Sequence, residues 1–188
     1  RVLVDHMGGG FGAKQDLFQS EFLCALLARQ TRRPVRMEYT REETFLGGRT
    51  RHPVKIWLKQ GFRNDGTLVA RQARVVYNSG AYGSHGPAST FYTGVLTPVT
   101  YELPRFRFDA CRVFTNKPAC GPKRGHGTPQ PRFGQEVQLD KIAEKLGKDP
   151  AELRLGMINK PNSLTANWLR IGSIGLEQCI REVVSRSK

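Results

Sequence analysis

Two short stretches of this 188-residue sequence combine residue types that favour ligand binding. The first runs from Gly8 to Lys14 and reads GGGFGAK. Glycine has no Cβ and accepts positive φ, so such a loop lets the backbone approach a ligand closely. Free N–H groups at the start of a following helix would favour an anion or a polar oxo group. The alternative interpretation is a tight turn between a strand and a helix.

The spacing around Lys14 excludes two common phosphate-binding loops. In a P-loop the lysine follows a glycine and precedes serine or threonine, whereas Lys14 follows Ala13 and precedes Gln15. In a dinucleotide-binding loop a glycine stands five residues after the first one, and Ala13 occupies that place after Gly8.

The second stretch runs from Lys123 to Gln130 and reads KRGHGTPQ. Arg124 carries a planar fork of donors that stays charged, which suits it to orienting an oxygen-rich substrate. The glycines on either side of His126 permit backbone contact. A solvated basic loop is the alternative interpretation.

The elements that must position these loops follow from periodicity and turn residues. Apolar patterning predicts strands at residues 2–4, 34–39, 53–62, 67–77 and 106–114. Helical spacing predicts helices at residues 15–30, around 139–146, from 150 and from 176. Asn64-Asp65-Gly66 predicts a hairpin turn, and Asp149 followed by Pro150 and Glu152 predicts a capped helix start. The order suggests an α+β fold of mixed sheets with packed helices. We expect two units, residues 1–104 with the glycine loop and 105–188 with the arginine loop.

The formal net charge of +14 raises the alternative of a basic nucleotide- or nucleic-acid-binding module. The excess is spread along the chain, at +2, +5, +4 and +3 for residues 1–50, 51–100, 101–150 and 151–188, with no block of five like charges. We therefore expect no nucleic-acid partner, and acidic partners in other parts of a larger assembly.

Four cysteines lie far apart and form no C-x-x-C pair, so we expect no metal ligation by this chain. No apolar run of membrane-spanning length and no signal peptide occurs, which predicts a soluble protein without a membrane partner, in the cytoplasm. The sequence begins at Arg1 in a strand-like run without an initiator Met, so we treat it as a piece of a longer protein.

Taken in order, these motifs resemble the molybdenum hydroxylases, the xanthine dehydrogenase and aldehyde oxidase family. The resemblance rests on the glycine loop, the Asp65-Gly66 hairpin, Arg124-Gly125-x-Gly-x-Pro-Gln and a helix end at Leu146-Gly-Lys-Asp-Pro-x-Glu-Leu-Arg154. It covers nearly the whole chain. It implies a truncated molybdopterin-binding domain of the large subunit.

The resemblance also implies roles for particular residues. The glycine loop, through Gly9, Gly10, Phe11 and Gly12, would contact the molybdenum cofactor, and Arg124 would orient the substrate. The implied reaction hydroxylates an aldehyde, an N-heterocycle or an aromatic acyl-CoA with oxygen from water, or runs in reverse. The family's general-base glutamate comes from a G-x-G-E-type motif that is absent from this chain. The isolated fragment should therefore be inactive.

Cofactors and partners follow from the same resemblance. The cofactor would be molybdopterin in its cytosine dinucleotide form, as in bacterial members. Electrons would leave through [2Fe–2S] clusters and FAD on partner subunits or domains.

The substrate pocket departs from the family pattern at three positions. Gln15 stands where xanthine-specific members have glutamate, which disfavours purines. His126 stands where many relatives have an aromatic residue, and Gly125 stands where carbon monoxide dehydrogenases have a cysteine. Lys123 with Arg124 and His126 could form a pocket for a carboxylate or an acyl-CoA thioester. A catalytically degenerate scaffold with the same fold remains an alternative.

Overall fold

The structure is a computed structural model that describes residues 1–187. The chain forms two compact units, each described here by itself. Unit 1 contains Arg1–Pro53, Asn78–Pro87 and Arg112–Arg124. Unit 2 contains Val54–Tyr77, Ala88–Cys111 and the chain from Gly125 onward. Both units take residues from either side of position 104. The expected division into residues 1–104 and 105–188 stays a prediction.

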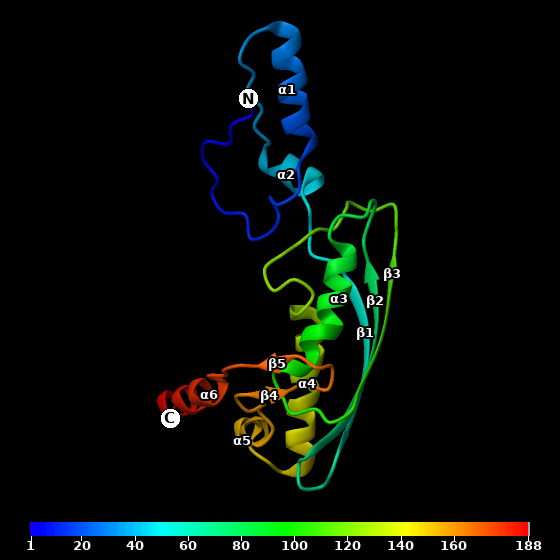
Figure 1. The fold of residues 1–188 in the computed structure, drawn as a ribbon, viewed down its shortest axis with the longest axis vertical. Coiled ribbons are helices and arrows are strands. Elements are labelled where there is room, and N and C mark those ends of the chain that lie inside the picture. The colour runs from blue at the N-terminus through cyan, green and yellow to red at the C-terminus, as the bar shows by residue number, and fades with distance from the viewer. Residues whose placement is uncertain (188) are drawn as a thin grey trace. The chain divides into compact units, whose positions relative to one another are not determined.

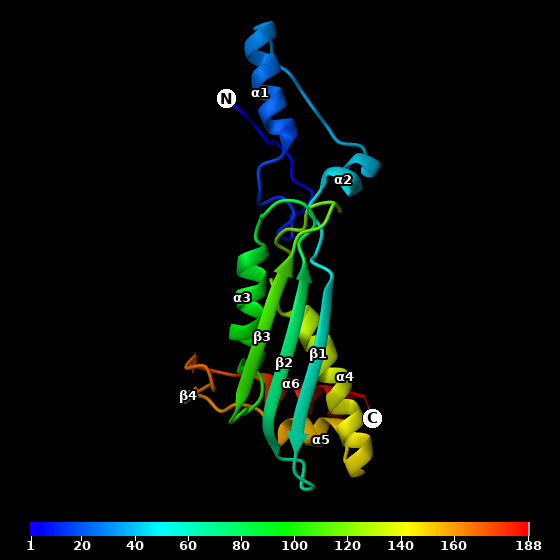
Figure 2. The same cartoon turned by 90° about the vertical axis from the view of Figure 1, so that its right-hand side faces the viewer.

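A three-stranded sheet carries unit 2. Strand β1 (Val54–Phe62) pairs antiparallel with β2 (Leu68–Asn78), and β3 (Phe106–Val113) lies on the other side of β2. The arrows of β2 and β3 point the same way and that of β1 points the opposite way (Figure 2). The predicted hairpin is confirmed, and Gly66 takes the positive φ of 91° that its turn requires.

Two helices cover one face of this sheet, α3 (Gly86–Leu96) and α4 (Pro129–Leu146) (Figures 1 and 2). The sequence analysis missed α3 because its glycine, serine and threonine residues are typical of loops. Close packing against the sheet explains why this segment forms a helix. A Cβ at Gly94 would lie 2.5 Å from the Phe108 ring, so this glycine lets α3 approach the sheet closely.

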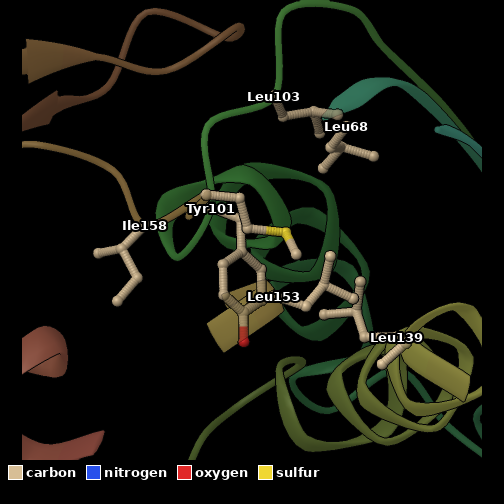
Figure 3. Packing of buried hydrophobic residues seen from close by; sticks show 8 residues of the cluster. Leu68, Tyr101, Leu103, Leu139, Leu153 and Ile158 are labelled. Atoms are coloured by element: carbon tan, nitrogen blue, oxygen red, sulfur yellow. The ribbon is translucent and has the colours of Figure 1, made fainter. Parts of the chain in front are cut away.

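The apolar core of unit 2 lies at the end of α4 (Figure 3). Leu139 and Ala143 of α4 are fully buried against Leu153 of α5 (Pro150–Leu155). Helix α5 begins as predicted, because the Asp149 carboxylate accepts hydrogen bonds from two backbone N–H groups of its first turn. The remaining buried members are Leu68, Tyr101, Leu103, Met157 and Ile158.

A polar network inside unit 2 ties β2 to α4. Arg71, only 2% exposed, donates to Gln60 and Gln135, each at 2.8 Å. Burial lowers the pKa of Arg71 to about 10. The Tyr101 hydroxyl bonds the Glu136 carboxylate at 3.0 Å, and burial, with this carboxylate's charge, raises the pKa of Tyr101 to about 12. The network fixes α4, the helix that begins directly after the arginine loop.

The rest of unit 2 is small. Strands β4 (Ser163–Leu164) and β5 (Arg170–Ile171) form a short antiparallel pair. The C-terminal helix α6 (Leu176–Arg186) confirms the prediction of a last helix. Within residues 1–187 no helix combines the length and the apolar character that crossing a membrane requires.

Unit 1 contains α1 (Gln19–Thr31), α2 (Arg41–Gly47) and the loops between and around them, which include residues 1–18. Helix α1 begins four residues later than predicted, where the Phe18 N–H donates to the Glu21 carboxylate at 2.6 Å. The predicted strands at residues 2–4 and 34–39 are wrong, because a strand needs a paired neighbour and neither segment has one within residues 1–187. The mixture of helices and sheets nevertheless confirms the α+β class.

Candidate cofactor and substrate site

The glycine loop of unit 1 has an unusual backbone. Gly9 and Gly12 have φ angles of 104° and 94°, which side chains rarely permit, and Phe11 itself lies at φ 51°. The Ala13 N–H closes the loop by donating to the Gly10 carbonyl at 2.8 Å. The N–H groups of Gly9, Gly10 and Phe11 have no protein acceptor among residues 1–187. These three donors are therefore available to an external ligand.

The two loops that the sequence singled out meet in unit 1. The Arg124 N–H donates to the Phe11 carbonyl at 2.9 Å, and the Arg124 guanidinium lies 5.0 Å from the centre of the Phe11 ring. A Cβ at Gly12 would lie 2.7 Å from the Pro122 carbonyl oxygen. The loops can approach this closely only because residue 12 is glycine.

Positive charge gathers around this junction. Arg51 donates through Nη2 to the Arg124 carbonyl at 2.5 Å. Burial, and then the charge of Arg51, lower the pKa of Lys123. The sequence analysis missed Arg51, because no motif links it to a loop 73 residues away. Three cations beside unpaired N–H groups favour an anionic, oxygen-rich ligand.

Gln15 lies in the same unit but in a separate set of contacts. Its side-chain nitrogen is 3.4 Å from Nε2 of His85. His85 Nδ1 lies 3.2 Å from the Asp16 carboxylate. The sequence analysis gave His85 no role, since a single histidine without a nearby motif carries no signal. Only the fold places it beside a predicted pocket residue.

His126 belongs to unit 2, as does the second glycine of the arginine loop. The Thr93 hydroxyl donates to the Gly127 carbonyl at 2.6 Å, and a Cβ at Gly127 would lie 2.2 Å from the Ser89 carbonyl oxygen. The His126 ring contacts the Tyr92 ring with centroids 5.6 Å apart. Tyr92 is 40% exposed, so α3 adds an aromatic side chain that the sequence analysis did not identify.

Among residues 1–187, histidine, cysteine, aspartate and glutamate side chains form no group of three that could hold a metal ion.

Comparison with a family model identifies the chain's relatives. Residues 1–157 match the model described as the molybdopterin cofactor-binding domain. The putative xanthine dehydrogenase molybdenum-binding subunit XdhA of Escherichia coli K12 is 38% identical over 187 residues, which is 97% of this chain and 24% of that protein. The nicotinate dehydrogenase large molybdopterin subunit of Eubacterium barkeri is 39% identical over 155 residues, 82% of this chain and 36% of that protein.

Solved structures agree with the sequence comparisons. The aldehyde oxidoreductase from Desulfovibrio gigas superposes with a TM-score of 0.88 at 30% identity, over 96% of this chain and 20% of that one. Quinoline 2-oxidoreductase from Pseudomonas putida 86 gives a TM-score of 0.86 at 28% identity, over 96% of this chain and 24% of that one. The chain thus spans about a fifth to a third of these relatives. These relatives give no support to the alternative of a nucleic-acid-binding module. The chain belongs to the molybdopterin-binding domain family of the xanthine dehydrogenases and aldehyde oxidoreductases.

Proposed function

We propose that this chain is the part of a molybdenum-dependent dehydrogenase that contacts the cofactor and orients the substrate. The longer enzyme hydroxylates an aldehyde, an N-heterocycle or an aromatic acyl-CoA with oxygen from water, or runs the reverse reduction. The observation that carries the proposal is the junction of the two loops. Three unpaired N–H groups, at Gly9, Gly10 and Phe11, lie in a loop that is bonded to the backbone of Arg124.

The residues of this junction fit the molybdopterin cofactor. Oxo groups and phosphate are oxygen-rich and anionic, and they match backbone N–H donors flanked by cations. In this proposal Gly9, Gly10, Phe11 and Gly12 hold the cofactor through their backbone. When bound, the cofactor supplies the redox chemistry that accepts two electrons from the substrate carbon. We propose its cytosine dinucleotide form, with [2Fe–2S] clusters and FAD on partner subunits or domains of a cytoplasmic enzyme.

Arg124 is the proposed substrate-orienting residue. Its guanidinium is held on one side by the Phe11 ring, and its backbone is held by Phe11 and Arg51. A side chain fixed in this way loses little entropy when it binds an oxygen of the substrate. Gln15, Lys123 and His126 are proposed as further residues of the substrate pocket. The general-base glutamate would come from a part of the enzyme beyond this chain.

The proposal is tested on the complete enzyme. We expect purified enzyme to contain molybdenum and to oxidise an aldehyde or an N-heterocycle with an artificial electron acceptor. The isolated 188-residue chain, given the same cofactor, should show no turnover because it lacks the general base. A complete protein that assembles without molybdenum would instead favour a degenerate scaffold, and turnover by the isolated chain would contradict the assignment of the base elsewhere.

Lys123 provides a prediction about the substrate. Replacing Lys123 with alanine in the complete enzyme should raise KM for a substrate with a carboxylate or an acyl-CoA group about fivefold, because a partly buried charge pair is worth roughly 1 kcal/mol. KM for neutral aldehydes should not change. Steady-state kinetics with benzaldehyde and 4-carboxybenzaldehyde measure the difference. Equal effects on both substrates would exclude an electrostatic role for Lys123.

A further inference from the structure

A cluster of polar side chains in unit 1 surrounds Asp16 and reaches Gln15. The Ser84 hydroxyl donates to Oδ2 of Asp16 at 2.5 Å, and Nε of Arg49 lies 3.5 Å from the same oxygen. His85 approaches the other oxygen, with Nδ1 3.2 Å from Oδ1. The side chains of Asp16 and Arg49 are 19% and 21% exposed, so the packing around them holds the carboxylate in place.

The hydrogen-bonding capacity of the Asp16 carboxylate determines which ring nitrogen of His85 carries the proton. An ionised carboxylate only accepts hydrogen bonds, so the His85 nitrogen beside Asp16 must carry its proton. In the neutral imidazole the opposite nitrogen, Nε2, is then an acceptor. The Gln15 amide nitrogen, 3.4 Å from this Nε2, is the donor that matches it. The carboxylate thus selects the histidine tautomer, and the tautomer selects which end of the Gln15 amide faces His85.

The carbonyl end of Gln15 is left facing away from this cluster. Gln15 is exposed, and within residues 1–187 no residue of the cluster other than His85 bonds its side chain. Its Oε1 can therefore accept a hydrogen bond from a ligand. Without His85 the amide could rotate and present either its donor or its acceptor.

We propose that Asp16 and His85 are positioning residues that lock the Gln15 amide, so that Gln15 presents its carbonyl oxygen to the substrate and selects a substrate bearing an N–H or O–H donor. This inference rests on the proposed function, which places Gln15 in the substrate pocket. Beyond that function, we infer that Gln15 accepts the hydrogen bond from the substrate, and that Asp16 and His85 act through Gln15.

The test compares ligands that differ only in the donor, in the complete enzyme. The pair is 4-hydroxybenzaldehyde with 4-methoxybenzaldehyde. Dissociation constants are measured by displacement, so the result does not depend on turnover. The unchanged enzyme should bind the donor-bearing member about three to ten times more tightly, as expected for one net hydrogen bond. The His85→Phe variant should lose most of this preference while binding the methylated member as before.

Rescue separates positioning from a purely structural role. A carboxylate presents an acceptor oxygen in either orientation, so adding Gln15→Glu to His85→Phe should restore the preference. The double variant Gln15→Ala, His85→Phe should be no worse than Gln15→Ala alone, because His85 acts through Gln15. His6→Phe, at an exposed histidine outside the cluster, is the matched control.

Three results would overturn the inference: equal loss of affinity for both members of a pair in His85→Phe, additive losses in the double variant, or no rescue by Gln15→Glu. If His85→Phe does not fold, Asp16→Asn replaces it, because the amide no longer enforces one tautomer and the same loss of preference is expected. Molybdenum content and turnover are measured in parallel. Enzyme that lacks both contradicts the proposed function, whereas active enzyme with an unchanged preference contradicts only the role of His85.

Discussion

Replacing Arg124 with lysine in the complete enzyme lowers kcat/KM by about 100-fold, while the molybdenum content stays the same. Lysine keeps the charge but loses the planar fork and its stacking on the Phe11 ring, which lies 5.0 Å from the guanidinium. A misplacement of about 1 Å at a positioning residue costs about this much in rate. The backbone bond from residue 124 to the Phe11 carbonyl survives the substitution, so the glycine loop keeps its place.

The measurement combines steady-state kinetics with metal analysis. Arg36→Lys is the matched control, because the Arg36 side chain is 86% exposed and pairs with Glu38 at the surface of the same unit. This control should retain the full kcat/KM. If Arg124→Lys loses molybdenum together with activity, the residue holds the cofactor loop rather than the substrate. If neither quantity changes, the orienting role is wrong.

Replacing Gly12 with alanine is expected to remove most of the cofactor. The new Cβ would lie 2.7 Å from the Pro122 carbonyl oxygen, and the residue would keep a φ of 94°. Backbone strain of this kind costs roughly 1–3 kcal/mol, and it is relieved only if the two loops separate. Separation would move the unpaired N–H groups away from Arg124. The molybdenum content should therefore fall about tenfold or more.

Gly8→Ala is the matched control in the same loop. A Cβ at Gly8 would meet no atom within 4 Å, and Gly8 does not have a positive φ. Molybdenum per subunit is measured by mass spectrometry, and the melting temperature reports on folding. Full molybdenum content in Gly12→Ala would show that the contact between the loops does not position the cofactor donors.

Much of unit 2 could be predicted from the sequence. The hairpin at Gly66 and the helix start at Asp149 depend on interactions between residues a few positions apart. The apolar pattern of Phe106–Val113 predicted a strand, and this strand forms by pairing with β2. Helix α3 could not be predicted in this way. Its small residues favour loops locally, and it forms because Gly94 fits against Phe108 and Thr93 bonds Tyr77, two side chains of the sheet that lie outside the helix in sequence.

The strands expected at residues 2–4 and 34–39 show the opposite error. Val2, Leu3 and Val4 have strand-like side chains, but a strand exists only when another segment pairs with its backbone. Within residues 1–187 no segment does so. The strand preference of the residues in a segment is therefore not enough to predict that the segment forms a strand.

Which loops matter, and to which family they point, could be read from the amino-acid sequence, because the glycine run, Arg124 and their order are visible without a fold. It could not show that Arg124 bonds the backbone of Phe11, that Arg51 supports Arg124, or that His85 faces Gln15. The two members of each pair lie between 70 and 113 positions apart in the sequence. Folding brings these pairs together, because the packing of distant segments sets which groups come within hydrogen-bonding distance.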